Sequence, residues 1–477
     1  MKLITHLKEI LFSASRLKCD SAPSNSNLPV VCTETGLVSG INGGHFQDVV
    51  TYRGIPYADT TAGDNRWREP QPAKKWNGVK DCSKFGSQCP QGGGGSEDCL
   101  FLNIFTSKST IKNSSNPKPV YLYIYGGGYT FGSANGDYGE YFANKGIVVV
   151  TINHRIGALG FMAHRALREE NKATNSSGNY GLLDQIYALK WIQRNILEFG
   201  GDPNCVTIGG QSSGGGSVYM LAVSPLAKGL FKNVISESGG VMASNDPQNT
   251  CISHYSVKEA EDRSNIWLSR KGISSSVTAK ELRALPLNKI VDGSLFDFGE
   301  HPPNWFIGPA LFHPVLDGYV IARTYQETME KGLQNQVGMI VATAVNTAIR
   351  EMTRISYSEW ANNWLKHSKK TVYQYVWTHG NEAGHGSDIS YFFNIIYGDK
   401  NSKDQQIADK MSSYIMNFIK TDNPNDNSLP NWPKQTIGQS KVMQVGNEFK
   451  QIEMVSDGNF NKKVDFFKRF WATQVTM

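Results

Sequence analysis

The stretch Val206–Met220 reads VTIGGQSSGGGSVYM, and it joins a β-branched segment to a cluster of small residues and then to an apolar run. At its centre, residues 210–214 read GQSSG and match the motif G-x-S-x-G. A predicted strand before the motif and a predicted helix after it are the context of a nucleophile elbow, whose glycines permit a tight turn that exposes the serine hydroxyl. The alternative is a plain glycine–serine turn. We interpret Ser212 as a candidate nucleophile.

Further short runs of β-branched and aromatic residues predict strands on both sides of this motif. They cover residues 120–125, 146–153, 206–208, 337–343 and 372–377. Because these runs are apolar throughout, they are typical of strands buried on both faces. Apolar residues at helical spacing predict helices over 182–196 and 407–419, each followed by a turn containing Asp and Pro. The alternation predicts an α/β fold with a mostly parallel central sheet flanked by helices on both faces.

Composition limits the classes of function. The chain has 477 residues, of which 39% are hydrophobic and 19% charged, as in ordinary globular proteins. The net charge of +6 is spread along the chain, so we expect no nucleic-acid partner. No apolar run reaches the roughly 20 residues of a membrane helix, so we expect no transmembrane span. The oligomeric state is left open.

We predict one domain over residues 28–477, preceded by an N-terminal segment 1–27. Lys8 and Glu9 interrupt the apolar stretch that a signal peptide needs, so this segment is at most a degenerate signal. Residues 241–336, rich in turns and of mixed polarity, are interpreted as an excursion from the sheet, and residues 348–371 as a shortened segment.

Seven cysteines leave at least one unpaired, and none has the C-x-x-C spacing of a zinc or redox site. We therefore predict neither a metal nor a cofactor. Asn113 and Asn175 each begin an Asn-Ser-Ser sequon in a polar, turn-rich context, and are candidate glycosylation sites. Together these features favour a secreted protein or one in the lumen of a secretory vesicle.

A serine hydroxyl needs a base to become nucleophilic, and in this arrangement the histidine comes last in the chain. His385 lies in the loop GHGSD beyond the predicted strand 372–377, where α/β sheets place reacting groups. His379 follows the same strand and competes for the role, but we interpret it as a surface histidine. His385 is the candidate base.

An oxyanion hole needs backbone N–H groups that a substrate can approach closely. Residues 125–129 read YGGGY at the end of the predicted strand 120–125 and supply such a loop. The phosphate-binding pattern G-x-x-x-x-G-K-[ST] is absent from the sequence. Acyl transfer is therefore favoured over phosphoryl transfer.

Several segments, in this order along the chain, resemble the type-B carboxylesterase and cholinesterase family of α/β-hydrolases. Besides YGGGY and the elbow, they are YRGIPYA (52–58), SEDCLFLN (96–103), NHRIG (153–157), GNYGLLDQ (178–185), PVLDG (314–318), HG (385–386) and NWP (431–433). The resemblance is dense from about residue 30 to 240 and thins afterwards. It implies the α/β-hydrolase fold and serine-esterase activity on small-molecule esters.

The resemblance also implies roles for individual residues. Ser212 would be the nucleophile, His385 the base, and the N–H groups of Gly127, Gly128 and Ser213 the oxyanion hole. Cys89 and Cys99 would form the first disulfide of the family. Arg66 with Glu97, and Arg155 with Asp184, would form its buried ion pairs.

Two departures bear on the substrate. The loop between Cys89 and Cys99 is reduced to PQGGGGSED, so the tryptophan that binds choline in cholinesterases has no counterpart. Gln211 replaces the acidic residue that often precedes the serine. Both changes argue against a cationic choline ester and for uncharged esters.

The third departure concerns the catalytic acid. Alignment of residues 337–349 with the family strand that ends in this acid places Thr347 at its position. Glu351 is the nearest carboxylate and a candidate substitute, the alternative being an exposed helix charge. Thr347 and His385 are only 38 positions apart, so helices that line the substrate gorge are expected to be missing. A trimmed natural variant and a faulty gene model both fit this pattern.

Two hypotheses follow. The first is a carboxylic-ester hydrolase that acts through an acyl-enzyme on Ser212, with activity weakened unless Glu351 or another carboxylate replaces Thr347. The second is a catalytically impaired relative used in adhesion, storage or partner binding. Ser212, His385 and the YGGGY loop favour the first, whereas Thr347 and the shortened segment favour the second.

Overall fold

The computed structural model describes most of the chain, with gaps at both ends and in several loops. The described residues are 29–112, 115–239, 254–291, 311–344, 350–380, 384–396, 399, 401–438, 441–453, 462 and 465. The N-terminal segment 1–27, Asn113 and Thr347 lie outside them.

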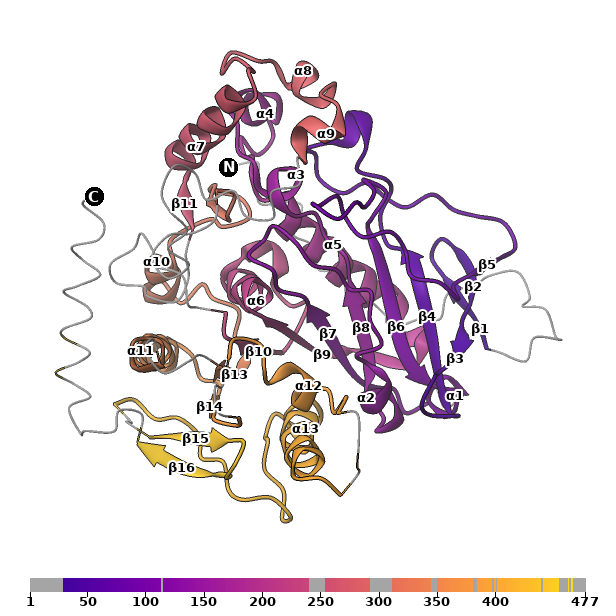
Figure 1. The fold of residues 1–477 in the computed structure, drawn as a ribbon, viewed down its shortest axis with the longest axis vertical. Coiled ribbons are helices and arrows are strands. Elements are labelled where there is room, and N and C mark those ends of the chain that lie inside the picture. Colours follow the sequence, from indigo (N-terminus) through magenta and orange to yellow (C-terminus); the bar gives the residue numbers. More distant parts are fainter. Residues whose placement is uncertain are drawn as a thin grey trace.

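A large twisted sheet organises the fold (Figure 1). In the described residues it has eleven strands, in the spatial order β16 (Lys450–Glu453), β15 (Lys441–Val445), β14 (Val372–Trp377), β13 (Gly338–Thr343), β10 (Asn233–Glu237), β9 (Gly201–Gln211), β7 (Lys118–Ile124), β8 (Val148–Ile152), β6 (Phe101–Ser107), β4 (Val49–Pro56) and β3 (Ile41–Asn42). The strands from β15 to β8 are parallel, and the outer pairs at both edges are antiparallel. The predicted mostly parallel sheet is confirmed.

Helices cover both faces of this sheet. On one face, α5 (Tyr180–Asn195) and α6 (Ser213–Val223) pack on β9, and α11 (Arg350–His367) packs on β13 and β14. On the other face, α2 (Glu140–Asn144) packs on β6 and β8, and α13 (Lys403–Thr421) packs on β7 and β9. The central strands are buried from both sides; every residue of β8 and β13, for example, is buried. This explains why their sequences are apolar throughout rather than alternating.

Smaller elements surround the main layers. The strands β1 (Val30–Thr33), β2 (Gly36–Ser39) and β5 (Val79–Asp81) form one small sheet, and β11 (Tyr255–Ser256) and β12 (Val315–Leu316) another. The remaining helices are α1 (Lys108–Lys112), α3 (Gly157–Phe161), α4 (Arg165–Glu170), α7 (Val257–Arg270), α8 (Ala279–Arg283), α9 (Leu287–Ile290), α10 (Tyr325–Glu330) and α12 (Ile389–Phe392), with 3₁₀ turns η1 (Gly63–Asn65), η2 (Ile196–Phe199) and η3 (Pro225–Ala227). Among the described residues of 241–336, none joins the large sheet, and α7, α8 and α9 gather at the top of Figure 1.

The two predicted helices form where the spacing placed them, and their ends have local causes. Helix α5 continues into the η2 turn and stops at Gly200, whose φ of 79° is left-handed. Helix α13 begins at Ser402, whose hydroxyl accepts a hydrogen bond from the Gln405 N–H, and ends at Asp422 with φ 63°. A serine N-cap and a left-handed C-terminal residue satisfy backbone groups that a helix leaves unpaired.

No helix in the described part of the chain is both long and apolar enough to cross a lipid bilayer.

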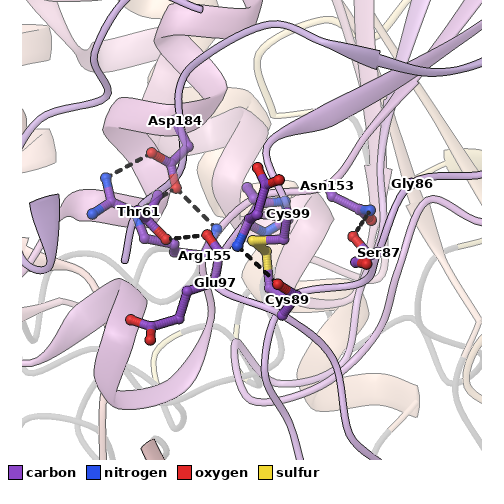
Figure 2. Close-up of a disulfide and its surroundings, with 12 residues drawn as sticks. Thr61, Gly86, Ser87, Cys89, Glu97, Cys99, Asn153, Arg155 and Asp184 are labelled. Carbon is purple, nitrogen blue, oxygen red and sulfur yellow. Dashed lines mark hydrogen bonds and ion pairs between the residues drawn. A yellow bond between two sulfur atoms is a disulfide. The ribbon is translucent and has the colours of Figure 1, made fainter. Parts of the chain in front are cut away.

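A disulfide and two ion pairs fasten the loops beside the sheet, and Figure 2 shows the disulfide and the pair of Arg155 with Asp184. Cys89 and Cys99 are bonded. Glu97 pairs with Arg66 through two hydrogen bonds of 2.5 and 2.6 Å, and its backbone carbonyl accepts one from the Thr61 hydroxyl. In the second pair, Arg155 and Asp184 are 1% and 0% exposed. The pairs that the family resemblance implied are therefore present in the structure.

Candidate active site

The predicted nucleophile elbow has the local geometry that its motif requires. Ser212 connects β9 to α6 and has φ 56° and ψ −126°, a conformation that non-glycine residues rarely adopt. Its N–H donates to the backbone carbonyl of Glu237 in β10 at 2.8 Å, and its own carbonyl accepts from the Gly216 N–H at 2.9 Å. Such strain costs about 1–3 kcal/mol and persists only where the surroundings hold it. Bonds on both sides of Ser212 hold this turn.

Close backbone packing explains both glycines of the motif. A Cβ atom at Gly210 would lie 2.5 Å from the carbonyl carbon of Gly214. A Cβ atom at Gly214 would lie 2.1 Å from the carbonyl oxygen of Ile124 in β7. Neither clash can be relieved by a side-chain rotation, because the atoms that would be hit belong to the backbone. The G-x-S-x-G pattern is thus a steric requirement of this turn.

The glycine-rich loop after β7 lies directly against the elbow. A Cβ atom at Gly126 would be 2.9 Å from the Cβ of Ser212. Gly127 and Gly128 have φ 123° and 61°. The N–H groups of Gly127, Gly128 and Ser213 donate to no acceptor within the described ranges. The loop is therefore placed as an oxyanion hole would be, with donors left for a ligand.

His385 lies beside the same elbow, in the loop between β14 and α12. The backbone carbonyl of Ala344, the residue that follows β13, acts on the His385 ring as an acceptor and partly opposes the lowering of the His385 pKa by burial. The Nε2 of His385 lies 3.2 Å from the side-chain nitrogen of Gln211, the neighbour of Ser212. Desolvation by the surrounding protein lowers the pKa of His385. No hydrogen bond between Ser212 and His385 is present in the described residues, as is common without substrate.

His379, the competing histidine, is fully engaged elsewhere. Its Nδ1 lies 2.7 Å from Asn447 Oδ1, and its Nε2 lies 2.7 Å from Asp404 Oδ1. Both of its ring nitrogens are thus engaged with side chains other than Ser212. His385 therefore fits the role of base better than His379.

The residue predicted at the position of the family acid and the candidate substitute acid both lie beyond what the structure describes. Thr347 lies outside the described residues. Glu351 is the second residue of α11, but its side chain is also outside the described part. Both assignments remain predictions.

Sequence reasoning missed a pair of buried carboxyl groups near the elbow. Glu237, at the end of β10, and Asp388, three residues after His385, are both 0% exposed. Asp388 Oδ2 accepts a hydrogen bond from the Tyr375 hydroxyl at 3.1 Å, whereas neither carboxyl oxygen of Glu237 has a partner in the described residues. Desolvation raises the pKa of Asp388 to about 6, and desolvation together with the charge of Asp388 raises that of Glu237 well above its usual range. The sequence signal that could have identified them is that each follows or ends a buried strand, at the carboxyl edge of the sheet.

This burial predicts how pH acts on stability. Because the pKa of Asp388 is higher in the folded state, the folded state retains a proton that the unfolded chain releases, so stability falls as pH rises from about 4 through 6. Asp388→Asn should remove this loss, so between pH 4 and pH 7 its unfolding free energy should rise by about 2 kcal/mol relative to that of the wild type. Urea unfolding of both proteins at the two pH values measures the change. If the unfolding free energies of the two proteins differ by the same amount at pH 4 and pH 7, the pKa of Asp388 is not raised in the folded state.

Comparisons with known proteins place this geometry in context. The carboxylesterase family matches residues 27–354 and again 345–467. The chain is similar to fumonisin B1 esterase of Sphingopyxis macrogoltabida, with 36% identity over 65% of this chain and 54% of that protein. It is 33% identical to esterase E4 of Myzus persicae over 83% of this chain and 70% of that protein. The chain thus spans about half of the first relative and 70% of the second.

Among solved structures, a PNB esterase has the same fold. Its TM-score is 0.77 at 24% identity, and the match covers 91% of this chain and 99% of that one. The two segments matched to the family overlap at residues 345–354, which include Thr347.

Proposed function

The chain belongs to the carboxylesterase family, whose members are carboxylic-ester hydrolases of the serine-esterase type with the α/β-hydrolase fold, and we propose that it hydrolyses small uncharged esters through an acyl-enzyme on Ser212. The observation that carries this proposal is the convergence of three separate loops on one point. The strained Ser212, the glycine loop packed against it and the His385 loop come from β9, β7 and β14.

The proposed reaction uses only these groups. His385 takes the proton of the Ser212 hydroxyl as its oxygen attacks the ester carbonyl. The N–H groups of Gly127, Gly128 and Ser213 stabilise the oxyanion that forms. His385 then gives the proton to the leaving alcohol, and a water molecule, deprotonated by the same histidine, releases the acid.

The group that orients His385 determines the expected rate. Among the described residues, the Ala344 carbonyl is the acceptor that acts on the pKa of His385, and it is a dipole and not a full negative charge. Neutralising the acid of a serine protease triad lowers kcat by about 10⁴, which corresponds to about 5.5 kcal/mol. The oxyanion hole and substrate binding still leave about 10³ to 10⁴ over water. Activated esters are therefore the substrates most suited to this site.

Glu351→Gln tests whether this carboxylate supplies the missing charge. If Glu351 orients His385, the variant should lower kcat for p-nitrophenyl butyrate at least about a hundredfold. Glu359→Gln, a second acid-to-amide change in the same helix, is the matched control. An unchanged rate in Glu351→Gln would exclude that residue and leave the Ala344 carbonyl as the orienting group.

The second candidate function is that of an impaired relative that binds a partner. It is favoured because the causes that shift the pKa of His385 include a backbone carbonyl and no charged side chain, and a carbonyl cannot replace the charge of the acid. Equal hydrolysis of p-nitrophenyl butyrate by the wild type and Ser212→Ala would remove the acyl-enzyme and leave this candidate.

The secretory location is also proposed. The Cys89–Cys99 disulfide supports it, because disulfides form and persist in oxidising compartments. Asn175, the described sequon asparagine, is exposed, as a glycosylation acceptor must be. Loss of mass on treatment with a peptide N-glycosidase, smaller in Asn175→Gln than in the wild type by the mass of one glycan, would test this site.

A further inference from the structure

We propose that Gln211 is a positioning residue that holds His385 in the tautomer of a general base, by donating a side-chain hydrogen bond to its Nε2. Gln211 ends β9 and precedes Ser212, so the same turn fixes both residues. This role rests on the proposed function, because it concerns the base of that reaction.

The side chain of Gln211 bridges the two loops of the site. Its amide nitrogen is 3.2 Å from His385 Nε2, and a Cβ atom at Gly386 would also lie 3.2 Å from that nitrogen. Its amide oxygen faces the other way, where a Cβ atom at Gly126 would approach it to 2.9 Å. The whole residue is only 7% exposed. Gln211 is therefore wedged between the glycine loop and the His385 loop.

The partners of His385 determine which way the amide must point. The Ala344 carbonyl can only accept, so the ring nitrogen facing it carries a hydrogen. Because Nε2 faces Gln211, we assign that hydrogen to Nδ1. In a neutral imidazole the other nitrogen, Nε2, then has a lone pair and needs a donor. The amide N–H of Gln211 supplies it, whereas a carboxylate at this position would face the lone pair with negative charge.

This arrangement prepares the base and sets its acidity. With Nδ1–H directed at the Ala344 carbonyl, the lone pair on Nε2 is the one available to take the Ser212 proton. The Gln211 N–H must leave Nε2 when the Ser212 hydroxyl forms its hydrogen bond to this nitrogen. A donor aimed at Nε2 stabilises the neutral ring and disfavours the imidazolium. In the described residues, desolvation and the Ala344 carbonyl are the causes that act on this ring, and no charged side chain is among them. The nearby carboxyls Glu237 and Asp388 are buried, with raised pKa values.

Two substitutions distinguish the hydrogen bond that the Gln211 amide donates from the space that its side chain fills. Gln211→Glu puts an acceptor in place of the donor, and Gln211→Met keeps a side chain of similar length without hydrogen bonds. We expect the Glu variant to raise the pKa of His385 by about one unit or more, because a carboxylate stabilises the imidazolium. The Met variant should raise this pKa less. It should also lower kcat up to about tenfold with little change in KM, because the ring is less firmly oriented once one neutral hydrogen bond is lost.

The pKa of His385 is measured by NMR titration of its ring nitrogens, assigned with His385→Gln, and in parallel from the acid limb of kcat/KM. Gln406→Glu is the control for the change of charge; Gln406 lies in α13, and its amide donates to the Asn401 carbonyl, which precedes the helix. The proposal is supported if the pKa of His385 rises in Gln211→Glu and in Gln211→Met but does not rise in Gln406→Glu. A His385 titration identical in the wild type and both Gln211 variants would overturn it. The NMR readout needs no activity, so failure of the acyl-enzyme, seen as hydrolysis independent of Ser212, is distinguishable from failure of this contact.

Discussion

Ser212→Ala is expected to lower kcat for p-nitrophenyl butyrate by at least about a hundredfold. In a complete triad, loss of the nucleophile costs about 2 × 10⁶ in kcat, and loss of the acid alone about 3 × 10⁴. If no carboxylate orients His385, the wild type already lacks the rate enhancement of about 3 × 10⁴ that the acid provides. Removal of Ser212 can then lower kcat by only about a further 10². If a carboxylate fulfils the role, the loss should approach 10⁶.

The size of this loss therefore reports on the acid as well as on the serine. Ser413→Ala, a serine in α13 whose hydroxyl only bonds the Asp409 carbonyl, is the matched control and should retain the wild-type rate. Steady-state kinetics with both variants, at a pH above the pKa of His385, gives the ratio. Wild-type activity in Ser212→Ala would be incompatible with the acyl-enzyme.

Arg155→Met is expected to destabilise the protein by about 3–5 kcal/mol. Arg155 donates from Nη2 and Nε to the two carboxyl oxygens of Asp184, at 2.7 and 2.9 Å, and both side chains are fully buried. Removing the guanidinium leaves a buried carboxylate without its counter-charge, which is far more costly than the net contribution of the pair.

Two further variants separate the pair from its surroundings. Arg155→Met combined with Asp184→Leu should recover much of the lost stability, because no charge is then left buried. Arg165→Met breaks an exposed pair with Glu169, in which the two side chains are 73% and 55% exposed, and should leave the stability almost unchanged, because water screens the pair. Urea unfolding compares the three proteins. Equal costs for Arg155→Met and Arg165→Met would show that burial of the first pair does not matter.

The fold could be predicted from the sequence because the strands bear strong local signals. Residues 372–377 form β14 without any shift of boundary, and the unbroken apolar runs at 120–125 and 337–343 form the buried parallel strands β7 and β13. The elbow was equally accessible, since Gly210 and Gly214 are required by backbone contacts that no other residue satisfies.

The electrostatics of the site could not be predicted in the same way. The acceptor that acts on the pKa of His385 in the described residues is the backbone carbonyl of Ala344, and every residue type has such a carbonyl, so the sequence does not reveal it. Glu237 and Asp388 are 151 positions apart, and only the parallel order of β10, β13 and β14 brings their strands together. Their burial, not their identity, raises their pKa values.

Gln211 shows how a single departure acquires meaning from the structure. In the sequence it is a neutral residue where an acid is often found, and it argued only against a cationic substrate. In the structure its amide nitrogen faces His385 Nε2 at 3.2 Å. A donor at this place fits a neutral base whose other nitrogen is held by a carbonyl.

Covalent labelling tests the central claim most directly, namely that Ser212 is a nucleophile activated by His385. A fluorophosphonate reagent reacts with activated serines, and mass spectrometry of the digested protein locates the adduct. We predict one adduct per chain, on the peptide that contains Ser212, formed more slowly in His385→Gln and absent from Ser212→Ala. An unlabelled Ser212 in a protein that hydrolyses p-nitrophenyl butyrate would contradict the account.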